Sequence, residues 1–233
     1  MRSGPLIGGI ALYNVAQNTL LTDRGYVVGN LVVTAAALAW ARRTGIGWDE
    51  LGLDPEDIPL GLATGAVVGT VAAGVTLAMR DSQLTRTLFD DDRLEGVGHR
   101  EVRYRVLVRF PLGTALFEEV VFRGVLPAAF RDRPVWQREL IAAGTFAAWH
   151  IIPTTHTVGA NRKARSLDPW RKTTAVLGGS LAAGLAGLGF SALRRWSSSL
   201  AAPWLAHTVV NGLTLALASS AWKQASGSAR VRT

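Results

Sequence analysis

The chain contains no cysteine among its 233 residues, and only 18% of its residues are charged, whereas 48% are hydrophobic. The lack of cysteine excludes disulfides, iron–sulfur clusters, thiolate zinc sites and a cysteine nucleophile. So low a charged fraction, with the apolar residues gathered in long segments, is not typical of a soluble domain of this length. The composition therefore favours a chain that lies in a lipid bilayer.

Seven apolar stretches approach the length of about 20 residues that a membrane-spanning helix needs. They cover residues 5–21, 25–41, 58–79, 104–130, 137–153, 173–193 and 198–221. The first is weak, because Asn14, Gln17 and Asn18 interrupt it. The alternating pattern of barrel strands is missing, so these segments must satisfy their backbone polar groups as helices. We therefore expect an all-α fold, a polytopic transmembrane helical bundle with six to eight membrane segments, as a single integral membrane domain over residues 1–233.

The formal net charge of +8 does not indicate nucleic acid binding, because the Lys and Arg residues lie between apolar segments instead of forming one basic face. Membrane lipids with anionic headgroups are the expected partners of these residues. The loops at 80–103 and 161–172 hold more Lys and Arg than the connections opposite, so we expect them to face the cytoplasm. If the source is bacterial, this multi-pass protein is expected in the plasma membrane.

Two patterns predict structure and not chemistry. Gly61, Gly65 and Gly69 recur every four residues, which gives one helix a smooth strip on which a neighbouring helix can pack closely. The other pattern is a set of tryptophans near the ends of predicted helices, as in the interfacial aromatic belts of membrane proteins: Trp136, Trp170, Trp196 and Trp222.

Ionisable side chains within apolar segments need an explanation, because each costs about 2.5–3.5 kcal/mol at the centre of a membrane helix. In segment 104–130, Glu119 and Arg123 are four residues apart and can form an ion pair on one helix face. Glu118 points about 100° away around the helix axis, so this pair does not account for it. Glu118 is the best candidate for a functional carboxylate, although a structural network in which both glutamates share Arg123 would use the same residues.

Two further apolar segments add polar groups. One places His150 one turn after Phe146, and the other places His207 and Asn211 four residues apart on one helix face. Each group alone is compatible with a hydrogen bond between helices. Their occurrence at membrane depth in the same chain as Glu118 favours a shared site.

This set of side chains suits the activation of water. A carboxylate can take a proton from water, one imidazole can orient that water, and a second imidazole with an amide can stabilise an oxyanion. Glu118, His150 and His207 could instead bind a divalent metal such as zinc, which lowers the pKa of bound water. The residues themselves leave the metal-dependent and the metal-free mechanism open.

The three polar blocks resemble the CAAX-protease and bacteriocin-processing (CPBP, Abi-type) family of intramembrane proteases. The family pattern E-E-x-x-x-R is matched at residues 118–123, F-x-x-x-H at residues 146–150, and H-x-x-x-N at residues 207–211. The blocks follow the family's order, and each lies in its own apolar segment. We therefore take residues 104–221 as the motif-bearing catalytic core, whereas the N-terminal 100 residues carry no recognisable signature.

The resemblance implies an intramembrane endopeptidase, a CPBP-type metalloprotease or a glutamate-dependent protease, that hydrolyses a peptide bond of a membrane-associated protein or peptide. A hydrophobic or lipid-modified substrate is implied as well. Glu118 would be the general base assisted by His150, and His207 with Asn211 would form the oxyanion site. The supporting residues would be Glu119, Arg123 and Phe146.

Two functions other than proteolysis use the same residues. A non-catalytic membrane immunity or scaffold protein could bind a peptide or partner in the same polar cavity, and it predicts that Glu118→Gln retains function. A transporter or proton relay also places Glu and His in the membrane, but the internal repeats that many transporters show are not visible. The motifs H-E-x-x-H, G-x-S-G and G-x-G-D of other intramembrane hydrolases are missing from the sequence.

Overall fold

The computed structural model describes residues 4–83, 85, 89 and 91–230, without the side chains of residue 162 and of residues 221–230. The chain is 85% helical, and its described part contains no strand. Each of the seven predicted segments lies in helix. The predicted all-α membrane bundle is confirmed.

The longer helices are α1 (Gly4–Thr19), α2 (Asp23–Arg43), α4 (Ile58–Asp81), α8 (Val135–Trp149), α11 (Pro169–Ser197) and α12 (Ala201–Arg230). One further long helical stretch consists of α5 (His99–Tyr104), η4 (Arg105–Ala115), α6 (Leu116–Glu119), η5 (Val120–Val125) and α7 (Leu126–Ala129). Of these, η4 and η5 are π-helical. The shorter elements are α3 (Trp48–Leu51), η1 (Pro55–Asp57), η3 (Asp92–Leu94), α9 (Ile151–Ala160) and α10 (Arg162–Arg165).

The helix ends follow local sequence signals. The Thr22 side chain accepts a hydrogen bond from the backbone N–H of Gly25 and so caps the start of α2. Asp168 caps α11 in the same way through the N–H of Arg171, at 2.9 Å. At the other end of α11, Ser198 has a φ of 54°, a left-handed conformation that stops the helix and turns the chain into α12.

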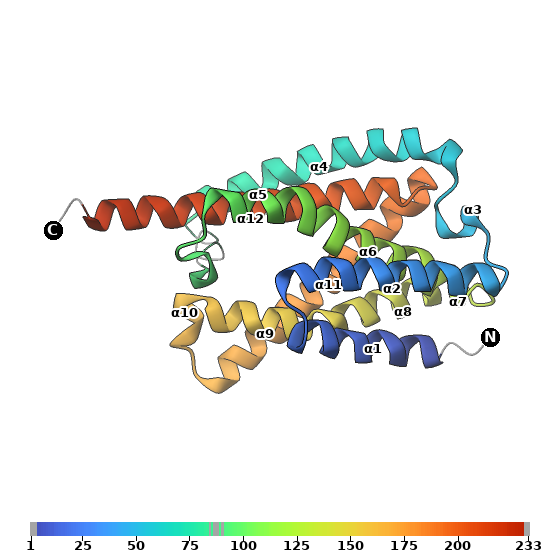
Figure 1. Ribbon diagram of the computed structural model, residues 1–233, viewed down its shortest axis with the longest axis horizontal. Helices are drawn as coiled ribbons and strands as arrows, with labels where there is room; N and C mark the ends of the chain where they lie inside the picture. The colour runs from blue at the N-terminus through green and yellow to red at the C-terminus, as the bar shows by residue number, and fades with distance from the viewer. Residues whose placement is uncertain (1–3, 84, 86–88, 90, 231–233) are drawn as a thin grey trace.

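The chain passes back and forth along the bundle, so its connections gather at two ends (Figure 1). The α1–α2 turn, the segment before α5, α10 and the C-terminus lie at one end, which we call the α10 end. The N-terminus, α3 and the connection from α7 to α8 lie at the other, the α3 end. The two basic loops at 80–103 and 161–172 therefore share the α10 end, as expected. That this end faces the cytoplasm stays a prediction.

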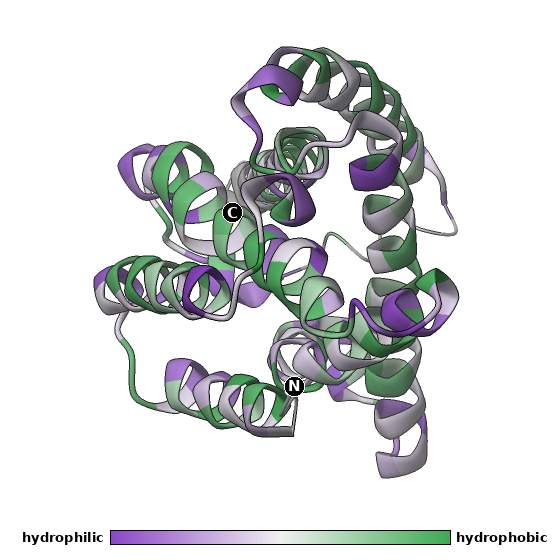
Figure 2. Cartoon of the chain, turned by 90° about the vertical axis from the view of Figure 1, so that its right-hand side faces the viewer, coloured by the Kyte–Doolittle hydropathy of each residue, from purple (hydrophilic) through white to green (hydrophobic). Residues whose placement is uncertain are grey.

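Apolar side chains cover the outside of the bundle. Rows of residues spaced by four, each more than half exposed, run along α4 (Val67, Val71, Val75) and α11 (Leu177, Leu181, Leu185). Four stretches of the described chain are long and apolar enough to cross a membrane: Asp23–Arg43, Trp48–Asp81, Pro169–Ser197 and Ala201–Ser220. Figure 2 shows hydrophobic residues along the helices and hydrophilic ones at many of their ends. Such an exterior suits hydrocarbon as the surrounding solvent.

Two of the predicted segments differ from simple spanning helices. The segment at 137–153 is divided at His150, where α8 ends and α9 begins, close to Pro153, which has no N–H to donate. The weak first segment forms α1, whose 16 residues measure about 24 Å at 1.5 Å per residue. That length falls short of a hydrocarbon core of about 30 Å, and the number of spans stays a prediction.

The predicted glycine strip is a packing face. Gly61, Gly65 and Gly69 are buried on α4 and lie against α12 and the turn before it. A Cβ on Gly65 would lie 2.6 Å from the carbonyl oxygen of Ala202, closer than atoms in contact can approach. The prediction of close helix packing is confirmed, and this contact fixes α12, which carries His207.

Candidate active site

The two motif glutamates lie where the long helical stretch has π-helical turns on both sides. Such wider turns leave backbone carbonyls without their usual helical partners, and they are frequent at functional sites. Side chains of neighbouring helices donate hydrogen bonds to two carbonyls of η4. The Asn30 side chain of α2 donates to the Gly113 carbonyl at 2.7 Å, and the Trp204 indole of α12 donates to the Pro111 carbonyl at 2.9 Å. These bonds hold α6, and with it the glutamates, between α2 and α12.

Glu119 joins a histidine and an arginine in the interior. Its Oε1 lies 2.7 Å from Nδ1 of His207, and its Oε2 lies 3.3 Å from Nε of Arg123. The side chains of Glu119 and Arg123 are each only 1% exposed. The predicted ion pair one helical turn apart is present, and it is extended across the bundle to α12.

Glu118 faces a different set of partners. Its Oε1 accepts a hydrogen bond from the indole N–H of Trp149 at 3.2 Å. Its Oε2 has no hydrogen-bond partner in the described part of the chain and lies 3.8 Å from Nε2 of His207. The His207 ring therefore lies between the two carboxylates, with one nitrogen directed at each.

Aromatic rings enclose this cluster. Phe190 of α11 stacks on the His207 ring with centroids 5.1 Å apart, and the Arg123 guanidinium lies 3.9 Å from the centre of the Phe146 ring. Phe117 contacts Trp149 at 5.1 Å between centroids. Because apolar rings exclude water, the charges that they enclose interact more strongly than charges at a surface would.

The two remaining motif residues lie outside these contacts. His150 lies at the α8–α9 junction. In the described part of the chain its imidazole contacts Phe146: Nδ1 lies 2.9 Å from the Phe146 carbonyl oxygen, and the two rings pack against each other. Asn211 lies one turn after His207 on α12, partly buried, and its amide makes no hydrogen bond within the described part of the chain. The structure thus brings Glu118, Glu119 and His207 together with Arg123, and it leaves His150 and Asn211 without a direct contact to either carboxylate.

A divalent metal site needs several His, Asp or Glu side chains grouped around one point. Within the described residues, no three His, Asp or Glu side chains are grouped in a way that could hold a metal ion. The expected ligand set of Glu118, His150 and His207 is not assembled, because the His150 imidazole is bonded to its own helix.

Sequence reasoning missed several residues that shape the site. Trp149 holds Glu118, and a signal for this was present, since a buried indole N–H next to a motif residue needs an acceptor. Asn14 donates to the Trp149 carbonyl oxygen at 3.0 Å, and Tyr13 donates to Asn30 at 2.6 Å. The helices α1 and α2, which carry no family signature, therefore hold the parts of the site in place through buried amides.

Three cavities are lined by residues that neighbour the cluster in the chain or contact it. A polar cavity of about 430 Å³ at the α10 end is lined by Asp91, Arg109 and Thr114, and Thr114 lies one turn before Glu118. Burial raises the pKa of the Asp91 carboxyl, but hydrogen bonds from Arg93 and its charge outweigh burial, so that the pKa is lowered overall. Two apolar grooves of about 430 and 500 Å³ flank α1, and they reach Phe117 and Trp149 respectively.

Comparison with known proteins gives one match. A family model described as type II CAAX prenyl endopeptidase, Rce1-like, matches residues 102–213. The matched range runs from α5 into α12 and includes all three motif blocks, which confirms the resemblance identified from the motifs. No curated protein and no solved structure matches the chain at a significant level.

Proposed function

We propose that this chain, whose residues 102–213 match the Rce1-like model of type II CAAX prenyl endopeptidases, is an intramembrane endopeptidase in which Glu118 activates the attacking water. The match to this family model supports the function of a membrane endopeptidase in general. The observation that carries the specific proposal is the free Oε2 of Glu118, which is buried, has no hydrogen-bond partner in the described residues and faces His207 at 3.8 Å.

In the proposed reaction, Oε2 of Glu118 takes a proton from a water molecule as the water oxygen attacks the carbonyl carbon of the scissile bond. The Trp149 indole holds the other carboxylate oxygen at 3.2 Å, so the base keeps one orientation. The proton then passes from Glu118 to the nitrogen of the scissile bond, the C–N bond breaks to release the amine and the new carboxyl group, and the Glu118 carboxylate is regenerated. A positioned general base of this kind accelerates a reaction by about 10²–10⁴-fold.

His207 is the proposed electrophilic partner. Its Nδ1 is held by Glu119 at 2.7 Å, and its Nε2 is directed to the side of Glu118 where the water would lie. In this position a proton on Nε2 can be donated as a hydrogen bond to the developing oxyanion. Asn211, one turn further along α12, is proposed to join it when a substrate is bound.

The cavities support a substrate that is partly in lipid and partly in water. The polar cavity at the α10 end offers a route for water and for a peptide, and the apolar grooves beside α1 offer space for a hydrocarbon chain next to Phe117 and Trp149. We therefore propose a membrane-associated, lipid-modified protein or peptide as the substrate. A prenylated peptide with a C-terminal CAAX sequence is the first probe, since this is the substrate that the family name states.

The test is a cleavage assay with full-length protein reconstituted in liposomes. A prenylated CAAX peptide is added, and release of the C-terminal tripeptide is measured by mass spectrometry. We expect wild-type protein to release the tripeptide and Glu118→Gln to do so at least 100-fold more slowly, because the amide cannot accept the proton. The matched control is Glu56→Gln, which removes an exposed carboxylate from the η1 turn and should cleave as wild type does.

Three outcomes would count against the proposal. Equal cleavage by Glu118→Gln would show that another group activates the water. If wild-type protein cleaves neither this peptide nor an acylated one, the substrate class is wrong, and the non-catalytic immunity or scaffold function gains support. Loss of cleavage with a chelator, restored by added zinc, would establish a metal-dependent reaction in place of the one proposed here.

A further inference from the structure

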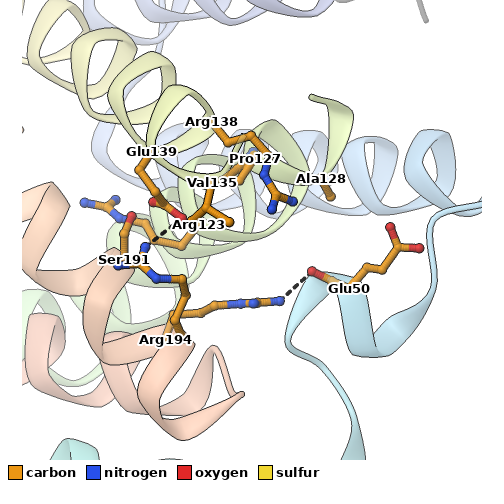
Figure 3. A pocket seen from close by; sticks show the side chains of 10 residues that line it. Glu50, Arg123, Pro127, Ala128, Val135, Arg138, Glu139, Ser191 and Arg194 are labelled. Atoms are coloured by element: carbon orange, nitrogen blue, oxygen red, sulfur yellow. Dashed lines mark hydrogen bonds and ion pairs between the residues drawn. The ribbon is translucent and has the colours of Figure 1, made fainter. Parts of the chain in front are cut away.

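A small polar cavity at the α3 end lies apart from the proposed peptide site. It has a volume of about 160 Å³ and is formed by residues of α3, η5, α7, α8 and α11 (Figure 3). Most of its charged lining residues are arginines, which project from several helices toward a common space: Arg123, Arg138, Arg194 and Arg195, with Glu50 and Glu139 as the acidic members. The proposed reaction uses none of these residues except Arg123.

Both acidic residues already have cationic partners. Glu139 pairs with Arg195 at 2.8 Å, and Glu50 pairs with Arg131, which does not line the cavity, at 3.3 Å. No carboxylate in the described part of the chain pairs with Arg138 or Arg194. The cavity therefore carries positive charge that the described residues leave unbalanced.

The cavity also contains buried donors without acceptors. Arg123 is 3% exposed, and neither its Nη1 nor its Nη2 has a hydrogen-bond partner in the described residues; the same is true of Nε of Arg194. One acceptor, Oε2 of Glu139, is likewise without a partner. Buried donors left unpaired are costly. Three donor atoms against one acceptor is a surplus that a bound anion with several acceptor oxygens would satisfy.

Exposed tryptophans place this cavity at the depth of lipid headgroups. Trp48, Trp136 and Trp196 belong to the elements around the cavity, α3 and the adjoining ends of α8 and α11, and they are 45%, 62% and 78% exposed. Such exposure at helix ends is typical of residues at the membrane–water interface. An anion that reaches the cavity along the protein surface would therefore come from the headgroup layer.

We propose that this cavity binds the phosphate group of an anionic phospholipid. Phosphate oxygens are acceptors only, and arginine is suited to bind them because its planar guanidinium can donate two hydrogen bonds at once. Free phosphate has the same chemistry, so the test must distinguish the two sources. This proposal does not rest on proteolysis, and its test needs no cleavable substrate.

The test uses full-length protein in detergent, titrated with phosphatidylglycerol and observed by native mass spectrometry. We expect Arg138→Gln to bind the lipid about tenfold more weakly than wild type, because it removes one charge-assisted contact. Arg138→Met, which keeps an unbranched apolar stem, should weaken binding similarly. The control is Arg43→Gln, which removes an exposed arginine at the end of α2, outside the cavity, and should bind as wild type does. Thermal unfolding of each variant checks that it is folded.

Two comparisons separate lipid from free phosphate and from general charge. A diacylglycerol with the same acyl chains should not bind at the site, because it lacks phosphate. If millimolar inorganic phosphate displaces phosphatidylglycerol, the cavity binds free phosphate as well; if it does not, the ligand is the lipid headgroup. Equal binding by wild type and folded Arg138 variants, or equal weakening by Arg43→Gln, would overturn the proposal.

Discussion

Glu118 and Glu119 are adjacent in the chain, yet they meet different surroundings because a helix turns by about 100° per residue. Glu119 faces α12, where it bonds His207, whereas Glu118 faces the C-terminal end of α8 and the indole of Trp149. In each carboxylate Oε2 makes no hydrogen bond to a described residue, but Oε2 of Glu119 lies 3.3 Å from Nε of Arg123 in an ion pair, whereas Oε2 of Glu118 lies 3.8 Å from Nε2 of His207. This difference is the reason to assign the reaction to Glu118 and the positioning of His207 to Glu119.

The indole of Trp149 is predicted to matter for rate more than for folding. Trp149→Phe keeps a ring that can pack against Phe117 and Phe122 but removes the N–H that holds Glu118. Without this bond the Glu118 carboxylate is no longer held in one orientation, so we expect tripeptide release in the liposome assay to fall at least about tenfold, and thermal unfolding checks that the variant is folded. Trp136→Phe, at an exposed position, is the control and should cleave normally. Undiminished cleavage by Trp149→Phe would mean that this bond does not orient the base.

At the scale of single residues, the sequence predicted the ion pair of Glu119 with Arg123, because spacing by four on a helix determines which side chains meet. It could not predict that His207 would bond to Glu119, since contacts between helices depend on their rotation and packing. For His150 the spacing places the ring one turn from Phe146, and that local contact is the one observed. Whether His150 and Asn211 take part in the reaction stays a prediction.

At the scale of helices, the small residues of α4 allow close packing against α12. Gly65→Ala would place a Cβ 2.6 Å from the backbone oxygen of Ala202, so α4 and α12 would have to separate. We expect the free energy of unfolding to fall by about 1–3 kcal/mol, as for other overpacked interiors. The measurement is thermal unfolding in detergent, followed by tryptophan fluorescence.

Gly74→Ala is the matched control on the same helix. No atom lies within 4 Å of a Cβ at this position, and alanine is the better helix former by about 0.8–1.0 kcal/mol. This variant should unfold at or slightly above the wild-type temperature. If both variants behave alike, the strip is not a tight packing face.

Helix positions were predictable from apolar length, but their local geometry was not. The π-helical turns of η4 and η5 have no marker in the apolar pattern. Side chains of α12 and α2 donate to the Pro111 and Gly113 carbonyls of η4, and these contacts between helices are likewise unmarked in the apolar pattern. Asn30, fully buried on α2, was hidden in a segment read only for its hydrophobicity. A buried amide in such a segment is a signal of a bond between helices.

At the scale of the whole molecule, apolar side chains lie on the outside and charged ones in the interior, the reverse of the arrangement in a soluble protein. Valines and leucines are exposed along the outer helices, whereas two glutamates, an arginine and a histidine are buried in the middle. Polar cavities lie near the two ends of the bundle: the larger one, at the α10 end, is lined by Thr114, one turn before Glu118, and the smaller one, at the α3 end, is lined by Arg123. The orientation of the bundle in the membrane therefore decides from which side water and peptide approach the proposed base.

Single cysteines can establish this orientation without removing any native ones, because the chain has none. Ser82→Cys and Ser166→Cys lie in the basic loops of the α10 end, and Asp132→Cys lies in the connection between α7 and α8 at the α3 end. The excess of Lys and Arg predicts that the α10 end is cytoplasmic. A membrane-impermeant maleimide added to intact cells should therefore label Asp132→Cys, and it should label the other two only after lysis. The opposite pattern would reverse the orientation and direct the polar cavity outward, whereas different labelling of Ser82→Cys and Ser166→Cys would contradict the arrangement of helices itself.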